Sequence, residues 1–306
     1  MEYKTLGRSG LSVSVAGLGC NNFGMRLDEE ASREVISAAL DAGITLFDTA
    51  RIYGGGRSEE FLGRALRGHL DEVVLATKFG RSAPGDPGGS RRHLVRSVET
   101  SLRLLEADHI DLLQLHYPDP ATPIEETLAA LTDLVRAGKV LYIGCSNFEG
   151  WRLADADWTA RTRGFEPFVS VQNEWSLLSR GIEEEVTVAA GRFGLSVLPY
   201  FPLASGLLTG KVTRGSAPPA ESRLAVSYFA SVLTDANFDK LERLTGWAVE
   251  HGRSLTELAL SWLASQPLVA SVIAGATTPE QVKTNVAATR TDLTPAEVAE
   301  VAALVG

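Results

Sequence analysis

The stretch FDTARIYGGGRSEEFLGRAL, residues 47–66, indicates how the chain is built. Phe47 ends an apolar run that is typical of a short buried strand. Asp48 and Tyr53 follow on a turn that leads into three glycines, and a helix is predicted from about residue 58, with Ser58 as its N-cap. Catalytic side chains are common where a strand passes into a loop. The carboxylate and the phenol are therefore candidate catalytic groups, although a buried Asp that caps a loop under a packed Tyr would give the same pattern.

The bulk composition argues against several classes of protein. The 306 residues are 44% hydrophobic and carry a net charge of −9, which argues against nucleic acids and anionic membrane surfaces as partners. No apolar run reaches the ~20 residues of a membrane helix, and the first residues contain no hydrophobic signal region. The two cysteines, Cys20 and Cys145, fit a reducing compartment, and no cluster of His and Cys has the spacing of a zinc site. We expect a cytoplasmic protein without a bound metal.

Predicted strands and helices alternate along the chain. A hairpin is expected at 2–6 and 11–15, followed by strands at about 13–18, 44–48, 73–77, 111–115, 140–145, 168–172, 196–200 and 269–273. Helices are expected at about 28–42, 58–67, 91–105, 124–137, 149–162, 182–193, 234–251, 255–265 and 278–288, with one more after Thr294-Pro295. Short apolar strands separated by helices indicate a parallel sheet, and eight such units indicate a (β/α)8 TIM barrel.

The barrel is expected to be a single domain over residues 1–306, because no Pro- or Ser-rich linker divides the chain. The N-terminal hairpin would cover the bottom of the barrel, and extra helices would follow at the C-terminal end. Residues 203–233 exceed the repeating strand–helix unit. A loop of that length in a compact domain is usually functional.

Polar side chains stand at the ends of the predicted strands. They are Asp48, Lys78, His116, Ser146 with Asn147, Gln172 and Tyr200, in chain order. Because the carboxyl ends of barrel strands share one face, where active sites lie, these side chains should gather at one rim. Each alone has an ordinary explanation, such as a Lys that reaches water or a Ser-Asn pair that caps a helix. The joint pattern is what indicates a site.

Asp48, Tyr53, Lys78 and His116 together suit the reduction of a carbonyl group. A Tyr with a pKa of about 10 is a poor acid at neutral pH, and an adjacent Lys78 should lower that pKa. Asp48 would hold Lys78, and His116 would donate a hydrogen bond to the oxygen that Tyr53 protonates. The hydride must then come from a nicotinamide or a flavin. The segment GLGCNNFG lacks the spacing of a Rossmann fingerprint, so the barrel rim itself would bind a nicotinamide.

The chain resembles the aldo-keto reductases along nearly its whole length. The motifs FDTARIYG, ATKFG, DLLQLHYPD, IGCSNF, SVQNEWSLL, YFPLASGLLTGK and SVIAGATTPEQVKTN occur in the order of that family. The resemblance implies a (β/α)8 barrel and NAD(P)H-dependent reduction of aldehydes or ketones. It makes Asp48, Tyr53, Lys78 and His116 the catalytic tetrad, with Tyr53 as the general acid.

The same resemblance implies the cofactor-binding residues. Ser146, Asn147 and Gln172 would hold the nicotinamide carboxamide, Tyr200 would stack on its ring, and the run after Tyr200 would wrap the pyrophosphate. The full expected set is Cys20, Asn21, Asp48, Ser146, Asn147, Gln172, Tyr200, Phe201, Pro202, Leu203, Ala204, Ser205, Gly206, Lys211, Arg223, Gly275, Thr277, Gln281 and Asn285. No metal is expected among them.

The sequence departs from the best-known reductases of the family in the loop after the last strand. Their Lys, Ser and Arg for the 2′-phosphate of NADP are replaced by Gly275, Ala276 and Gln281. In this the chain is similar to the bacterial branch and to the potassium-channel β subunits, in which residues matching Arg223 and Thr277 can bind the phosphate. We therefore expect NADPH as the cofactor, with NADH as the alternative.

Two further functions remain open beside carbonyl reduction. One is a dehydrogenase that oxidises a sugar or sugar alcohol, and the other is a cofactor-binding regulatory subunit with little turnover. The complete tetrad argues against the second. Arg51 stands where the family often has an Asp or Glu, and Asn21, Asn22 and Trp175 are expected to line the mouth of the pocket. The sequence identifies neither the carbonyl substrate nor the oligomeric state.

Overall fold

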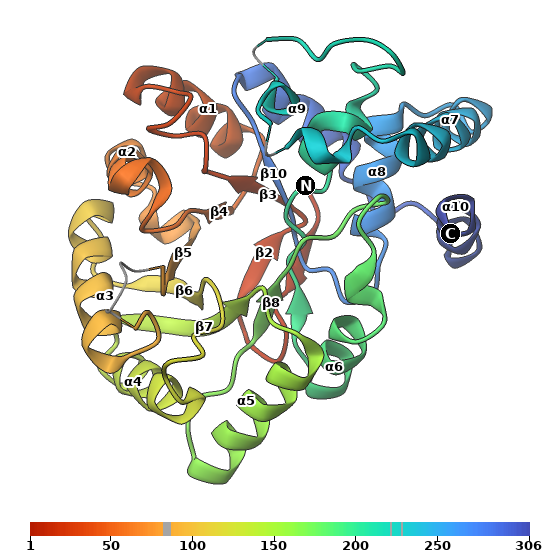
Figure 1. Cartoon of the computed structure of the whole chain (residues 1–306). Helices are drawn as coiled ribbons and strands as arrows, with labels where there is room; N and C mark the ends of the chain where they lie inside the picture. The colour runs from red at the N-terminus through yellow and green to blue at the C-terminus, as the bar shows by residue number, and fades with distance from the viewer. Residues whose placement is uncertain (82–86, 221, 228) are drawn as a thin grey trace.

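The computed structural model describes residues 1–81, 87–220, 222–227 and 229–306. Within these ranges, parallel strands form one eight-stranded sheet in the order β10-β3-β4-β5-β6-β7-β8-β9. Their bounds are β3 (Ala16–Gly19), β4 (Leu46–Asp48), β5 (Val74–Phe79), β6 (Ile110–Leu115), β7 (Val140–Ser146), β8 (Ser170–Gln172), β9 (Ser196–Val197) and β10 (Val272–Gly275). Parallel bridges from Val197 to Val269 and from Tyr200 to Ile273 join the two ends of this sheet. The sheet therefore closes, and the predicted (β/α)8 barrel is confirmed (Figure 1).

The helices surround the strands (Figure 1). They are α1 (Glu29–Asp41), α2 (Arg57–Ala65), α3 (Arg91–Leu105), α4 (Ile124–Arg136), α5 (Gly150–Arg163), α6 (Val186–Phe193), α7 (Asp235–Glu250), α8 (Leu255–Ala264), α9 (Pro279–Ala288) and α10 (Pro295–Val305). Short 3-10 helices add η1 (Tyr53–Gly56), η2 (Leu70–Glu72), η3 (Gly181–Glu183), η4 (Ala204–Thr209), η5 (Arg223–Ala225) and η6 (Ala230–Val232). No described helix is both long and apolar enough to cross a bilayer.

The predicted boundaries of α4 are confirmed. Pro123 precedes its first residue, and Gly138, with φ of 72°, follows its C-cap in the left-handed region that glycine adopts without strain. Leu128 and Leu131, three residues apart and so on one face of the helix, are fully buried. The 3.6-residue period is thus sufficient to orient this helix against the sheet.

The N-terminal hairpin closes the bottom of the barrel, as predicted. Its strands β1 (Tyr3–Thr5) and β2 (Ser12–Ser14) pair antiparallel. Leu6 and Val13 from the hairpin belong to the same buried apolar cluster as Val74, which begins β5. Gly7 has φ of 55°, and a Cβ at that position would lie 2.1 Å from the carbonyl oxygen of Val169. The glycine therefore allows the hairpin turn to lie directly against the barrel.

The inner face of the barrel changes from apolar to polar along each strand. Side chains two residues apart on a strand point to the same face. Strand β4 therefore brings Leu46 and then Asp48 inward, and β5 brings Ala76 and then Lys78. Leu46 and Ala76 lie in the apolar cluster shared with the hairpin, whereas Phe47 lies in the larger core between the sheet and the helices. The register of the strands thus collects polar side chains at the carboxyl end of the barrel.

The expectation that Ser58 caps α2 is wrong. The N-cap is Gly56, with φ of 101°, and the helix begins at Arg57. The Ser58 hydroxyl instead donates to the carbonyl oxygen of Cys20 at 2.8 Å and lies 2.8 Å from the hydroxyl of Thr49. Because these partners are distant in sequence, the local capping pattern could not show that the Ser58 side chain points inward.

Several strand limits also differ from those expected. The expected strand at 13–18 is divided between the hairpin, which keeps Val13 and Ser14, and β3, which starts at Ala16. The last strand, expected at 269–273, lies at Val272–Gly275, where Val272 pairs with Ala16. The segment around β10 is apolar over a longer run than the strand, so hydrophobicity alone does not mark its ends.

Candidate active site

Asp48 and Lys78 form a buried ion pair at the centre of the rim. Lys78 Nζ lies 2.5 Å from Asp48 Oδ2 and also donates to the carbonyl oxygen of Thr49 at 2.9 Å. The two charged residues are only 3% and 1% exposed. Burial by itself lowers the pKa of Lys78, but Asp48 and Tyr53 outweigh it and raise that pKa. Lys78 is therefore held as a cation at neutral pH.

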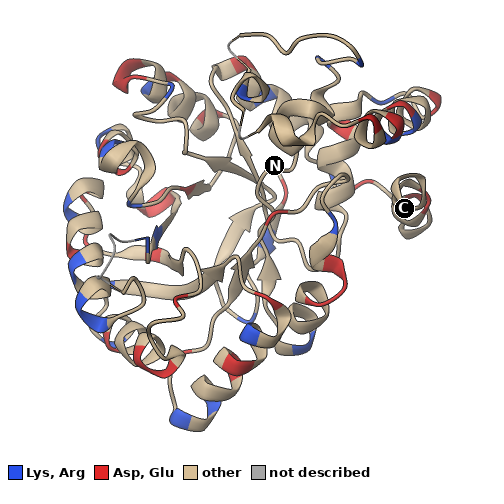
Figure 2. Cartoon of the chain, viewed as in Figure 1, with Lys and Arg blue, Asp and Glu red and all other residues tan. Residues whose placement is uncertain are grey.

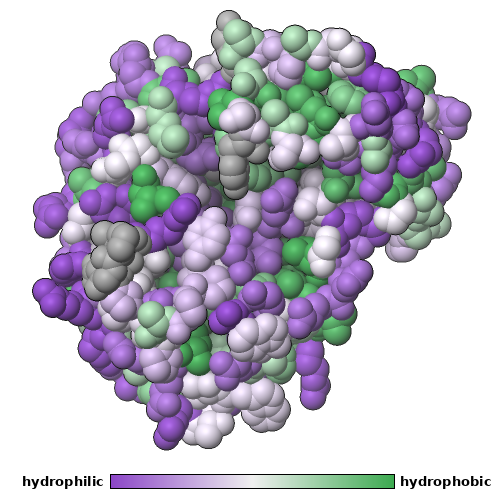
Figure 3. All heavy atoms as spheres, in the orientation of Figure 1, coloured by the Kyte–Doolittle hydropathy of each residue, from purple (hydrophilic) through white to green (hydrophobic). Residues whose placement is uncertain are grey.

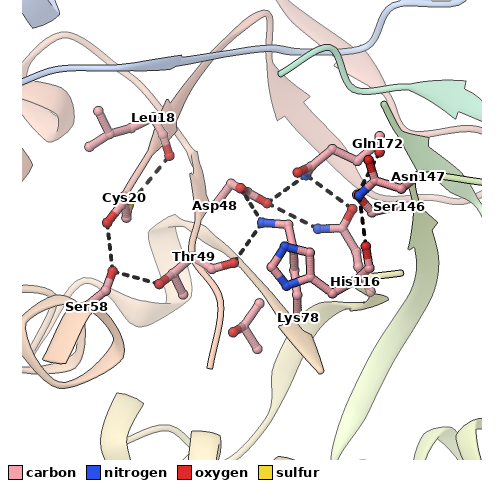
Figure 4. Close-up of polar contacts among 12 residues, drawn as sticks. Leu18, Cys20, Asp48, Thr49, Ser58, Lys78, His116, Ser146, Asn147 and Gln172 are labelled. Carbon is pink, nitrogen blue, oxygen red and sulfur yellow. Dashed lines mark hydrogen bonds and ion pairs between the residues drawn. The ribbon is translucent and has the colours of Figure 1, made fainter. Parts of the chain in front are cut away.

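Two side-chain amides hold the other oxygen of Asp48. Its Oδ1 accepts a hydrogen bond from Gln172 Nε2 at 2.8 Å (Figure 4). It accepts another from Gln114 Nε2 at 3.1 Å. A buried ion pair is stable only when its remaining lone pairs are also satisfied. Gln114 was missed by the sequence reasoning, although it stands two residues before His116 and so shares the inner face of the barrel.

Tyr53 begins η1 directly beside this ion pair. Lys78 Nζ lies 5.2 Å from the centre of its ring, and Lys78 forms a hydrogen bond with it. Burial raises the pKa of Tyr53 by more than the positive charge of Lys78 lowers it. The expected lowering of this pKa is therefore wrong for the net effect, because the site excludes water from the phenol as well as placing a cation beside it. The phenol remains protonated at neutral pH.

His116 follows β6 and lies edge-to-face against Tyr53, with 5.9 Å between the ring centres. Burial, with the nearby charges of Lys78 and Arg81, lowers the pKa of His116 to about 3. The imidazole is therefore neutral at neutral pH and can donate one N–H hydrogen bond without a positive charge. Figure 4 shows the ring beside the side chain of Lys78.

The ends of β7 and β8 place three more predicted residues beside the tetrad. Ser146 Oγ donates to the carbonyl oxygen of Gln172 at 2.7 Å. Asn147 Nδ2 donates to the carbonyl oxygen of His116 at 2.9 Å, and the hydroxyl of Tyr200 donates to Asn147 Oδ1 at 2.8 Å. A continuous chain of hydrogen bonds thus fixes the ring of Tyr200 relative to the backbone of His116.

Cys20 was expected to contact a cofactor, but the structure buries its thiol completely. Its Sγ faces the carbonyl oxygen of Leu18 at 3.6 Å, and burial, with the charge of Asp48, raises the pKa of the thiol well above its usual value. The main chain of Cys20 remains near the rim, because its N–H donates to the carbonyl oxygen of Asp48. The structure therefore leaves the backbone of Cys20, and not its thiol, as the part that can lie near a cofactor.

The segment after β9 makes an unusual backbone turn. Phe201, Ala204 and Ser205 have φ values of 51°, 46° and 59°, in the left-handed region that non-glycine residues rarely adopt. Gly206 follows with φ of 105°. Such strained positions cluster at ligand-binding sites. The expected run Phe201, Pro202, Leu203, Ala204, Ser205 and Gly206 leads through this turn into η4, with Lys211 exposed just beyond it.

Arg223 connects the long loop to the end of β3. Its Nη2 lies 3.2 Å from Asn21 Oδ1 and 3.1 Å from Asn22 Oδ1. Its guanidinium also lies over the rings of Phe201 and Phe229, at 5.3 Å and 5.4 Å from their centres. The structure therefore brings Arg223 and Asn21 together.

The expected residues of β10 and α9 bond to one another instead. Gln281 Oε1 accepts from the backbone N–H of Thr277 at 2.8 Å and lies 3.1 Å from its hydroxyl. Asn285 Nδ2 donates to the carbonyl oxygen of Gly275 at 3.4 Å. Asn22 connects this group to Arg223, because its Nδ2 donates to the carbonyl oxygen of Ala276 at 3.1 Å and its Oδ1 lies 3.1 Å from Arg223 Nη2.

Hydrophilic side chains gather around the hollow near the middle of the face drawn in Figure 3. Over the described part of the chain, no group of three or more His, Cys, Asp or Glu residues could hold a metal ion. The chemistry of the rim is thus that of a phenol, an ammonium, a neutral imidazole and several amides.

Comparison with known proteins identifies the family. The model of the aldo/keto reductase family matches residues 16–305. The chain belongs to the aldo/keto reductase family. It is 38% identical to a probable voltage-gated potassium channel subunit beta of Oryza sativa, over 94% of this chain and 91% of that protein. It is 39% identical to the uncharacterized oxidoreductase YrpG of Bacillus subtilis, over 96% and 92%. It is 35% identical to L-glyceraldehyde 3-phosphate reductase of Escherichia coli, over 94% and 87%. The recognised family is therefore confirmed, and this aldo/keto reductase chain has both enzymes and channel subunits among its relatives.

Proposed function

We propose that this protein reduces the carbonyl group of a small aldehyde or ketone to an alcohol, with NADPH as cofactor and Tyr53 as proton donor. The observation that carries the proposal is the placement of Tyr53, Lys78 and His116 around one point of the rim. A phenol beside a buried ammonium and a neutral imidazole can polarise and protonate a carbonyl oxygen. Membership of an oxidoreductase family supports the same class of reaction.

Each tetrad residue has one task in this proposal. Tyr53 holds the proton that passes to the carbonyl oxygen, and its raised pKa keeps the phenol protonated at neutral pH. Lys78 stabilises the phenolate that remains after the transfer. Asp48 keeps Lys78 charged and in place. His116, as a neutral donor, directs its N–H to the carbonyl oxygen and orients the substrate.

The donor set of the rim fits a nicotinamide dinucleotide. Asn147 and Gln172 carry amides that match a carboxamide, and the ring of Tyr200 is held at its hydroxyl by Asn147. Lys211 and Arg223 add positive charge on the long loop, where a pyrophosphate or a ribose phosphate would lie. When bound, the nicotinamide supplies the hydride that reduces the carbonyl carbon.

The preference for NADPH over NADH rests on Arg223. A guanidinium can meet two phosphate oxygens at once, and a charge-assisted hydrogen bond corresponds to about ten- to a hundredfold in affinity. Thr277 and Gln281 would add neutral hydrogen bonds. One cation gives a smaller preference than two, so NADH stays usable in this proposal.

Two alternatives are kept beside the reductase. One is an oxidative dehydrogenase of a sugar or sugar alcohol. The other is a regulatory subunit, because two plant relatives are named as probable voltage-gated potassium channel subunits beta. The complete tetrad, of which Asp48, Lys78 and His116 are buried, favours turnover over a purely regulatory role.

A panel of aldehydes and ketones, assayed with NADPH and with NADH by nicotinamide absorbance, tests the proposal. Sugars and sugar alcohols with the oxidised cofactors form the reverse arm. We expect turnover of carbonyls and a higher kcat/KM with NADPH. Tight NADPH binding without turnover in either direction would contradict the reductase and support the regulatory alternative.

A further inference from the structure

A cavity of about 490 Å³ lies beside the tetrad, between the turn that holds η1, the end of β5 and the inner side of α3. Lys78 and His116 belong to its lining, so it is continuous with the catalytic groups. Its volume lies within the roughly 300–1,000 Å³ typical of pockets that bind small molecules. The proposed reductase function uses only Lys78 and His116 from this lining and gives no role to the other lining residues.

The described lining of this cavity is strongly basic. Besides Lys78 it contains Arg51 from the turn after β4, Arg81 from the segment after β5 and Arg96 from α3, together with His93. None of the described lining residues carries a carboxylate, although the whole protein has a net charge of −9. Figure 2 shows blue positions along α3 and at the end of β5 beside it. A cleft lined by one sign of charge concentrates ligands of the opposite sign.

Arg51 is built into the cavity wall. Its backbone N–H donates to the carbonyl oxygen of Lys78 at 3.1 Å, which ties it to a catalytic strand. A Cβ at Gly56 would lie 2.5 Å from Arg51 Nη1, so the glycine leaves space for the guanidinium. The nearby carboxyl of Glu59 accepts from the hydroxyl of Thr77 at 2.7 Å instead.

The positive charge of Arg81 lies near His116. Its guanidinium lies 4.9 Å from the centre of the Tyr117 ring, which stacks on His116 at 5.1 Å. The positive charge of Arg81 is also one of the causes that lower the pKa of His116. The basic lining is therefore close enough to the catalytic imidazole to act on one end of a molecule whose carbonyl lies there.

We propose that this cavity binds an anionic group of the carbonyl substrate, a phosphate or a carboxylate, while the carbonyl lies at Tyr53 and His116. The inference rests on the proposed reductase function, and it adds a substrate class and the residues that select it. Arg51 and Arg96 meet the anion, since the fork of a guanidinium matches both carboxylate and phosphate oxygens. Arg96 has another interaction partner in the structure and exchanges that partner for the anion.

Matched pairs of substrates test this selectivity. The first pair is glyceraldehyde 3-phosphate with glyceraldehyde, and the second is 4-carboxybenzaldehyde with benzaldehyde. We expect kcat/KM to be higher for the anionic member of at least one pair. The pair that shows the difference identifies whether the cavity binds a phosphate or a carboxylate. Arg51→Gln or Arg96→Gln should lower the anionic-to-neutral ratio by about ten- to a hundredfold each.

Arg92→Gln is the matched control, because Arg92 is exposed on the same helix, outside the cavity lining, and its loss changes the net charge equally. Its ratio should stay at the wild-type value. An unchanged ratio in both the Arg51 and Arg96 variants, or an equal fall in the control, overturns the proposal. Arg96→Glu places a negative charge at an exposed position of the lining and should lower the ratio further, with circular dichroism to confirm that the variant is folded.

A binding measurement separates this inference from the proposed function. Calorimetry with 4-carboxybenzyl alcohol and with inorganic phosphate, on cofactor-saturated protein, needs no turnover. Binding that weakens in Arg51→Gln and Arg96→Gln but not in Arg92→Gln supports the anion site even if no carbonyl is reduced. Reduction of neutral aldehydes without binding of either probe leaves the reductase intact and refutes the anion site.

Discussion

The two sides of the barrel mouth are built in different ways. The ends of β4 to β8 carry buried side chains that bond one another, from the ion pair of Asp48 and Lys78 to the amide of Gln172. The opposite side is the segment between β9 and α7, whose described residues include the short 3-10 helices η4, η5 and η6. Arg223 joins this segment to Asn21, just after β3. Catalytic groups must be held to within about 0.5 Å, which strands provide, whereas a cofactor needs a side that can open. The comparison predicts large effects on the strand side and smaller ones on the loop side.

Replacing Tyr53 by Phe should give the largest effect. The change removes only the acidic hydroxyl, and general acid catalysis is typically worth about 10²–10⁴-fold, so kcat should fall by that factor. NADPH affinity, measured by fluorescence titration, should stay near the wild-type value. Tyr3→Phe is the control, because that exposed hydroxyl donates to Gly43 far from the rim. A kcat within about twofold of wild type in Tyr53→Phe would remove Tyr53 from the role of acid.

Replacing Lys78 by Met should destabilise the fold as well as the reaction. It leaves Asp48 buried without its cation, and removal of one partner of a buried pair costs about 3–5 kcal/mol. Urea denaturation measures this loss. The control is Lys139→Met, which breaks a surface pair with Glu99 and should cost at most about 1 kcal/mol. An equal decrease in the free energy of unfolding in the two variants would show that the buried pair contributes no more to stability than a surface pair.

The stability of the protein should fall in acid because of His116. Its pKa is about 3 in the folded state and 6.5 in the unfolded reference, so between these values the unfolded chain takes up the proton first. The free energy of unfolding then decreases as pH falls from 6.5 toward 3 and is unaffected by this group above 6.5. From pH 7 to pH 5, wild type should lose about 2 kcal/mol more than His116→Gln. An NMR titration of the His116 ring with a midpoint near 6.5 would contradict this.

On the loop side, Arg223→Ala should lower the affinity for NADPH by about tenfold and leave the affinity for NADH nearly unchanged, because only NADPH carries the 2′-phosphate. Direct titration of both cofactors measures the effect. Arg214→Ala is the matched control in the same loop, since Arg214 pairs with Asp235 and Asp239 on α7. Equal weakening of both cofactors would place Arg223 at the pyrophosphate or in holding the loop through Asn21 and Asn22.

Much of the strand side could be predicted from local patterns. The alternation of short apolar runs with helical periods predicted the barrel, and the polar residue at each strand end predicted Asp48, Lys78 and His116. Gln114 could have been found by the same rule, because it shares the inner face with His116. The thiol of Cys20 could not be placed, since whether a side chain at a strand end points into the mouth or into the wall depends on packing.

The sequence alone determined the class of fold and the family, and it predicted the tetrad, because strand periodicity and motif order are local properties of the chain. Only the tertiary structure decided the ionisation of the site, since burial outweighs the charge of Lys78 in setting the pKa of Tyr53. Only the tertiary structure also brought Arg51, Arg81 and Arg96 to one cavity, from segments up to 45 residues apart in the chain. Electric fields and solvent exclusion act through space, so they depend on which distant segments pack together and not on spacing along the sequence.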